Sequence, residues 1–195
     1  MSSSSALVGT VMSDVEVNIT VSVDGFVTGP DPGPAQGLGA GGEPLHDWLS
    51  HDEGRRLSAA TFAAAGAVVT SRTVYDLTGG WGADGLYRMP VFVVTHRPSP
   101  TVRKGDTTFT FVEGVPAAIS AAIAAAAGKD VHVMGGASIA RQVLSAGLAT
   151  RLRLHVAPML LGAGTPLFNG APPARLTHLE TVDTPFATHI TYSCA

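Results

Sequence analysis

Charge is scarce in this chain: only 14% of its 195 residues are Asp, Glu, Lys or Arg, and the formal net charge is −3. Such a charge gives no bulk attraction to nucleic acid or to an anionic membrane, so we expect neither as a partner. Cysteine is nearly absent, with Cys194 alone near the C-terminus. A single thiol cannot form an internal disulfide, which favours a reducing compartment, and we expect a cytoplasmic protein.

Long apolar runs and metal-binding motifs are also lacking. The longest apolar run beside helix-like sequence, 117–127, is far shorter than the roughly 20 residues that span a bilayer. The seven histidines are scattered without the paired spacing of a zinc site, so we expect no metal. Residues 1–13 have neither a basic start nor a continuous apolar core. We therefore expect a disordered leader rather than a signal peptide, followed by one domain over 14–195.

Apolar patterns predict about eight strands, with helices between the middle ones. Residues 15–23 are apolar at every odd position, which is the period of a strand with one buried face. Further strands are predicted at 67–70, 91–95, 107–112, 131–134, 152–157, 176–182 and 189–192, and helices at 44–57, 72–77, 115–127 and 138–146. Glycine and proline indicate loops at 28–42 and 160–167. This order predicts an α/β layered domain whose sheet is mostly parallel at its centre and antiparallel at one edge.

Polar residues or glycines follow three of the predicted buried strands directly. Gly135 and Gly136 lead from a strand into a helix start, where close backbone approach and free N–H groups favour phosphate. Arg72 follows the strand at 67–70, and the Thr95-His96 turn follows the strand at 91–95. Ligands of open α/β sheets lie beyond the carboxyl ends of the strands. The three turns together predict one phosphate-binding site, although each alone could be a solvated turn.

Two rival motifs carry less weight. Ser138 lies in a strand-turn-helix setting similar to a hydrolase nucleophile elbow, and Asp183 and His189 follow it in the order of a catalytic triad. The last elbow position is Ala140 instead of glycine, and the chain is short for such a hydrolase. The G-x-G at 162–164 has no third glycine, which makes it a weak dinucleotide fingerprint.

Residues 131–168, VHVMGGASIARQVLSAGLATRLRLHVAPMLLGAGTPLF, resemble the C-terminal reductase domain of bacterial riboflavin-biosynthesis proteins and its stand-alone dihydrofolate-reductase-like relatives. Residues 22–27, 69–75 and 93–98 resemble further segments of that family, and the likeness extends from residue 15 to the C-terminus. The resemblance implies a dihydrofolate-reductase-like three-layer fold, a mostly parallel central sheet of about eight strands, bound NADPH and a homodimer.

The resemblance also implies a role for particular residues. The residues expected at the diphosphate are Gly135, Gly136, Ala137, Ser138 and Ile139. Those expected near the 2'-phosphate are Arg72, Thr73, Thr95 and His96. Val27 is expected near the nicotinamide, and the residues expected near the substrate are Gly162, Gly164, Leu167 and Phe168. Arginine holds phosphate well, so Arg72 and Arg97 favour NADPH over NADH. The chain departs from the family pattern G-R-x-T, because the threonine is replaced by Val74 or displaced to Thr73.

We therefore expect hydride transfer from NADPH to a small heterocyclic substrate, a pteridine or a ribosylaminopyrimidine. The candidate catalytic residues are Asp47 and Asp24. True dihydrofolate reductases carry an acid on the first helix, where Asp47 lies beside Trp48, although Asp47 could equally be a solvent-facing helix acid. The altered phosphate motif and the open choice of acid allow a second hypothesis, a nucleotide-binding sensor or a catalytically degenerate member without turnover.

Overall fold

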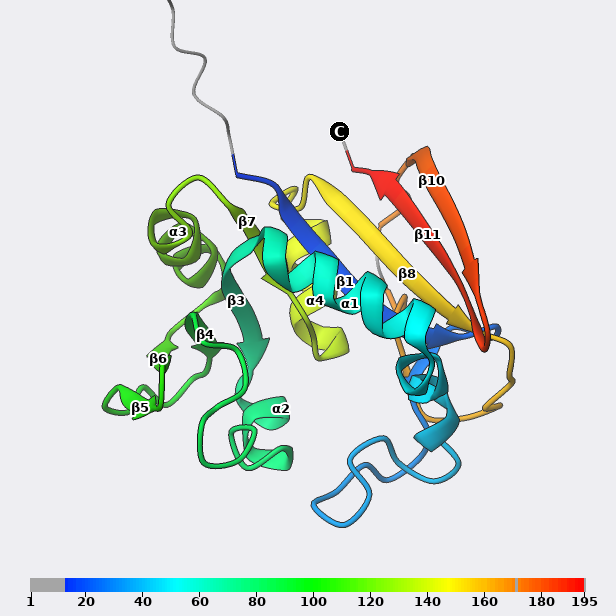
Figure 1. The fold of residues 1–195 in the computed structure, drawn as a ribbon, viewed down its shortest axis with the longest axis horizontal. Coiled ribbons are helices and arrows are strands. Elements are labelled where there is room, and N and C mark those ends of the chain that lie inside the picture. The colour runs from blue at the N-terminus through cyan, green and yellow to red at the C-terminus, as the bar shows by residue number, and fades with distance from the viewer. Residues whose placement is uncertain (1–12, 171, 195) are drawn as a thin grey trace, which may run out of the picture.

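The computed structural model describes residues 13–170 and 172–194; the predicted leader therefore lies outside the described residues except for its last position. Within this part of the chain, nine strands form the central sheet (Figure 1). In spatial order they are β10 (Thr177–Thr184), β11 (Ala187–Ser193), β8 (Arg151–Ala157), β1 (Val15–Ser22), β7 (Asp130–Val133), β3 (Ala65–Ser71), β4 (Pro90–Val94), β6 (Thr107–Val112) and β5 (Val102–Lys104).

The pairing confirms the predicted α/β sheet with a parallel centre. The six strands from β8 to β6 pair in parallel, whereas β10, β11 and β5 are antiparallel to their neighbours. A separate small sheet joins β2 (Phe26–Thr28) to β9 (Thr165–Pro166). The short strands β2, β5 and β9 were absent from the sequence prediction, because runs of two or three residues show no period.

Helices cover both faces of the sheet, which gives the three layers. The odd-numbered side chains of β1 pack with α3 (Val115–Ala125) and α4 (Ala137–Ser145) in the main apolar cluster. Figure 1 shows α1 (Asp52–Ala64) crossing in front of the central strands, with α4 behind them. The even-numbered face of β1 is covered as well, and its polar residues Glu16 and Thr20 are buried. The expectation that only one face of this strand is buried was wrong, because hydrogen bonds between side chains compensate the buried polar groups.

The helix predicted at 44–57 is two helices. A 3-10 helix, η1 (Glu43–Ser50), precedes α1, and His51 between them is extended. The backbones cross closely here, since a Cβ on Gly54 would lie 1.9 Å from the Trp48 carbonyl oxygen. Because the helix breaks at His51, Trp48 can pack against the sheet while α1 crosses the face of the sheet. No helix in the described ranges is both long and apolar enough to cross a membrane.

Candidate cofactor-binding site

The turns after β3 and β7 are joined by hydrogen bonds. The Ser71 N–H and the Thr70 hydroxyl both donate to the Gly135 carbonyl oxygen, at 3.0 and 3.1 Å. The Ser71 hydroxyl accepts from the Val74 N–H at 3.0 Å, which caps α2 (Arg72–Leu77), and from the Gly136 N–H at 3.4 Å. The starts of α2 and α4 are therefore held side by side at the carboxyl ends of two neighbouring strands. A serine directly before a helix is a capping signal that could have revealed Ser71 in the sequence.

The start of α4, at the Gly135-Gly136 turn, leaves two backbone donors without a partner. Gly135 has φ 111°, a backbone conformation that favours glycine. The α4 N-cap, Gly136, supplies no side-chain cap, and the N–H groups of Ala137 and Ser138 make no hydrogen bond to any described residue. Ile139 is different, because its N–H bonds to the Gly136 carbonyl and its side chain is buried. Two unsatisfied N–H groups at a helix start can bind a phosphate.

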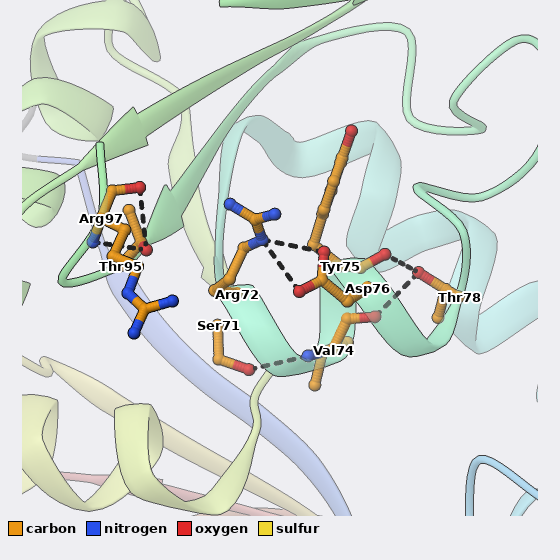
Figure 2. Close-up of polar contacts among 8 residues, drawn as sticks. All are labelled: Ser71, Arg72, Val74, Tyr75, Asp76, Thr78, Thr95 and Arg97. Carbon is orange, nitrogen blue, oxygen red and sulfur yellow. Dashed lines mark hydrogen bonds and ion pairs between the residues drawn. The ribbon is translucent and has the colours of Figure 1, made fainter. Parts of the chain in front are cut away.

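Arg72 begins α2, and its guanidinium group is already engaged. Its Nε lies 2.8 and 2.9 Å from the two carboxylate oxygens of Asp76, as Figure 2 shows. The same group lies over the Phe111 ring, 5.3 Å from the centroid. Thr73 is exposed, and its side chain makes no hydrogen bond within the described chain. A phosphate that uses Arg72 must therefore compete with the Asp76 carboxylate.

The turn after β4 lies beside α2, because Ser71 and Val94 are register partners. Thr95 is buried; its N–H donates to the Val112 carbonyl, and its hydroxyl accepts from the Arg97 N–H at 3.0 Å (Figure 2). His96 and Arg97 are exposed. The Arg97 guanidinium makes no hydrogen bond or ion pair with any residue that the structure describes, so of Arg72 and Arg97 it is Arg97 that is available to a ligand.

Asp24 fixes the loop that follows β8. One carboxylate oxygen accepts from the Ser22 hydroxyl at 2.5 Å and the Leu161 N–H at 3.1 Å, and the other from the Gly162 N–H at 2.6 Å. The Ser22 bond, together with the two backbone donors, lowers the pKa of Asp24 below its ordinary value. Both oxygens are occupied in the ionised form, so the geometry suits a structural clamp better than a proton donor.

The residues predicted near the nicotinamide and the substrate belong to the same loop and to the β2–β9 pair. Val27 is buried in β2, and Gly164 approaches that strand so closely that an added Cβ would lie 2.0 Å from the Thr28 carbonyl oxygen. Leu167 is fully buried, whereas Phe168 is 52% exposed. Arg141 of α4 donates to the Pro166 carbonyl at 2.7 Å, an anchor that sequence reasoning missed. The loop is thereby tied to the helix that begins at the glycine turn.

Asp47 and its neighbour Trp48 point to different environments. Asp47 is exposed on η1, and its carboxylate makes no hydrogen bond to another described residue. Trp48 is buried, donates from Nε1 to the Thr20 hydroxyl at 3.2 Å and stacks on His155 with the ring centroids 4.4 Å apart. The carboxylate of Asp47 is therefore free, and the rigid Trp48 anchors the helix that carries it.

A chain of hydrogen bonds crosses the sheet beneath Trp48. His155 Nε2 lies 2.8 Å from Oδ1 of the Asn18 side-chain amide, His155 Nδ1 lies 2.5 Å from His189 Nδ1, and His189 Nε2 lies 2.7 Å from the Thr184 hydroxyl. Since an amide oxygen only accepts, His155 donates from Nε2 and accepts at Nδ1, and His189 donates from Nδ1. Burial lowers the pKa of both rings, so both are neutral. His155 is thus a structural residue.

The hydrolase arrangement does not form. Ser138 is exposed on α4, and its hydroxyl accepts from Gln142 at 3.0 Å. Both ring nitrogens of His189 are used by His155 and Thr184, and Asp183 accepts from Thr188. No triad hydrogen bond therefore joins Ser138, His189 and Asp183.

Three solved structures share this fold. A protein from Shewanella sp. PV-4, provisionally named for riboflavin biosynthesis, has a TM-score of 0.71 and 22% identity, covering 93% of this chain and 99% of its own. A pyrimidine reductase-like protein from Corynebacterium diphtheriae has a TM-score of 0.61 and 16% identity, covering 94% and 92%. The third is the diaminohydroxyphosphoribosylaminopyrimidine deaminase/5-amino-6-(5-phosphoribosylamino)uracil reductase of Thermotoga maritima. Its TM-score is 0.67 and its sequence identity 9%, and the match covers 94% of this chain and 57% of its own.

A sequence comparison with curated proteins finds no significant match. The sequence profile of one protein family, described as the RibD C-terminal domain, matches residues 14–187. This match covers both joined turns and the Asp24 loop, and it confirms the resemblance seen in the sequence. The chain belongs to the RibD C-terminal domain family.

Proposed function

We propose that this protein is an NADPH-dependent reductase that transfers a hydride to a small heterocyclic substrate of the pteridine or ribosylaminopyrimidine type. The observation that carries the proposal is the pair of joined turns at Ser71 and Gly135, which sets the uncapped start of α4 beside the start of α2 at the carboxyl edge of a parallel sheet. Family membership supports the reductase class, and one structural neighbour is itself named a uracil reductase.

The residues of the site fit a dinucleotide phosphate. The free N–H groups of Ala137 and Ser138 would hold the diphosphate at the positive end of the α4 dipole. Arg97, whose guanidinium is uncommitted, would bind the 2'-phosphate, and Arg72 would join it by leaving Asp76. When bound, NADPH supplies the hydride. The protein orients the two reacting rings, and its own contribution to chemistry is one proton.

Of the two candidate acids, Asp47 suits the proton step better. The carboxylate of Asp24 is held ionised by three donors, whereas the carboxylate of Asp47 has no described partner. One observation favours a second function, a nucleotide-binding sensor: Asp47 is exposed on η1, and no described contact directs it toward the glycine turn. Binding of NADPH without turnover is the outcome that this alternative predicts.

We further propose a cytoplasmic homodimer. The lone Cys194 supports a reducing compartment. The outer strand β10 supports self-association, because most of its residues are exposed and its outer edge is unpaired in the described chain. Sedimentation of the purified protein measures this: a single monomeric species at micromolar concentration would rule out the dimer.

A turnover assay tests the reductase. Oxidation of NADPH is followed with dihydrofolate and with a phosphoribosylaminouracil as substrates, using Asp47→Asn and the matched exposed-acid variant Glu53→Gln. Wild type and Glu53→Gln are expected to oxidise NADPH with one substrate, and Asp47→Asn to lose about 10²-fold or more in kcat. Equal kcat in wild type and Asp47→Asn would remove Asp47 as the proton source. Tight NADPH binding with no oxidation for either substrate would favour the sensor.

A further inference from the structure

The two buried polar side-chain atoms that lack a hydrogen bond in the described chain lie in one place. They are Nδ1 of His132 and Nε of Arg153, and both residues line a cavity of about 170 Å³. His132 is only 6% exposed. Buried polar atoms in native proteins are nearly always paired, so two unpaired atoms on residues that line the same cavity point to a ligand or ordered water there.

This cavity is separate from the cofactor-binding site. It lies between the last turns of α1 and the first residues of β1, β7, β8 and β3, at the amino ends of the parallel strands. The glycine turn and the Thr95 turn follow the carboxyl ends of β7 and β4. The strands separate the two sites by four to seven residues, or roughly 13–23 Å at about 3.3 Å per residue. Nothing in the reductase proposal uses this edge of the sheet.

The cavity has no excess of positive charge, which disfavours an anionic ligand. Its charged lining consists of two carboxylates and two guanidinium groups, those of Glu16, Asp130, Arg151 and Arg153, and Arg151 is also paired with Asp14 at 2.6 Å. Burial, with a contribution from Arg153, lowers the pKa of His132 to about 4, so this ring is neutral near pH 7. An unpaired ionic ligand would add an uncompensated charge to a partly buried site, which costs free energy. The rest of the lining is small and includes Ala60, Ala64 and Val131.

Arg153 and its neighbour Glu16 define which groups the ligand must carry. The Arg153 Nε–H is a donor that is ion-paired with Glu16 Oε1 at 3.5 Å without the geometry of a hydrogen bond. Oε1 of Glu16 already accepts from Asn18 at 2.9 Å, whereas Oε2 accepts from no described residue. A ligand must therefore offer an acceptor to Arg153 and a donor to Glu16 from neighbouring atoms.

We propose that this cavity is a second binding site, which takes a small uncharged ring carrying a carbonyl next to an N–H, as in a cyclic amide. The carbonyl oxygen accepts from Arg153, the N–H donates to Glu16, and the flat ring lies against the alanines of α1 and Val131. The volume is about half of the roughly 300 Å³ at which drug-sized pockets begin, so one ring fits and a nucleotide does not. The proposal does not depend on the proposed reductase function.

The test uses 2-pyridone as the probe and N-methyl-2-pyridone as the matched ligand, which keeps the ring and carbonyl but lacks the N–H. Titration of the full ¹⁵N-labelled chain is followed by amide chemical shifts, without NADPH. We expect 2-pyridone at about millimolar concentration to shift amides near residues 130–132 and 151–153. The N-methyl compound is expected to bind at least tenfold more weakly, because it has no donor for Glu16.

Two exposed positions of α1 give matched variants that should fold alike. Ala64 lines the cavity and Ala63 does not, although both are exposed on the same helix. Ala64→Leu should abolish the shifts, and Ala63→Leu should keep them; Glu16→Gln should weaken binding at least tenfold. The proposal is wrong if 2-pyridone causes no shifts, so that the cavity holds water only, if both ligands bind equally, if Ala64→Leu binds as wild type does, or if inorganic phosphate binds there instead.

Discussion

The buried histidine His132 makes the protein sensitive to mild acid. Burial lowers its pKa from 6.5 to about 4. The unfolded chain, with the ordinary pKa, binds the proton more readily than the folded chain does. Stability is therefore complete above pH 6.5 and falls as the pH drops from 6.5 towards 4. Between pH 7 and pH 5 this one residue should lower the free energy of unfolding by about 2 kcal/mol.

The assay is urea unfolding of wild type and His132→Gln at pH 7, 6 and 5. The glutamine variant is less stable at pH 7 because it leaves a polar group in the same buried place, but its loss of stability from pH 7 to pH 5 should be smaller by about 2 kcal/mol. His155, whose pKa is also lowered by burial, remains in both proteins and gives a common background. His178→Gln, at an exposed position of β10, is the control and should lose as much as wild type. Equal pH dependence in wild type and His132→Gln would refute the reasoning.

Further predictions concern the glycine turn, the loop clamp and the buried tryptophan. Gly135→Ala should destabilise the protein by about 1–3 kcal/mol, because φ is 111° there, and should weaken NADPH binding at least tenfold in a calorimetric titration. Asp24→Asn should increase hydrogen exchange of the amides at 161–162, because an NH2 group replaces one of the two oxygens that accept from them; unchanged exchange would contradict the clamp. Trp48→Phe should lower the free energy of unfolding in urea by about 1 kcal/mol, because it removes the donor to Thr20. An unchanged free energy of unfolding would show that this hydrogen bond does not stabilise the fold.

The sequence predicted the central sheet because its strands are long enough to show a period or a buried run. The alternation of 15–23 and the strand-turn-helix order around Gly135 placed β1, β7 and α4 within one or two residues. The break at His51 was invisible, because it arises from Trp48 packing against Thr20, His155 and His189 on three strands. Local periodicity does not report a contact made across the sheet.

The candidate site was predictable in place but not in its connections. Three strand ends carrying Arg72, Thr95 and Gly135 do come from neighbouring strands β3, β4 and β7. The sequence could not show that Asp76 occupies Arg72, which leaves Arg97 as the free cation. It also could not show that Asp24 is held by three donors, since two of them lie more than a hundred residues away in the chain. Electrostatic partners of this kind depend on the tertiary fold.

The measurement that tests the central claim most directly is a calorimetric titration of the protein with NADPH and with NADH. We predict a Kd for NADPH in the micromolar range, about −8 kcal/mol, and binding of NADH at least tenfold weaker. Arg97→Leu should remove that difference, whereas Arg56→Leu, an exposed arginine of α1, should leave it unchanged. If neither dinucleotide binds with a Kd below about 1 mM, roughly −4 kcal/mol, the cofactor-binding site and the reductase proposal are both wrong.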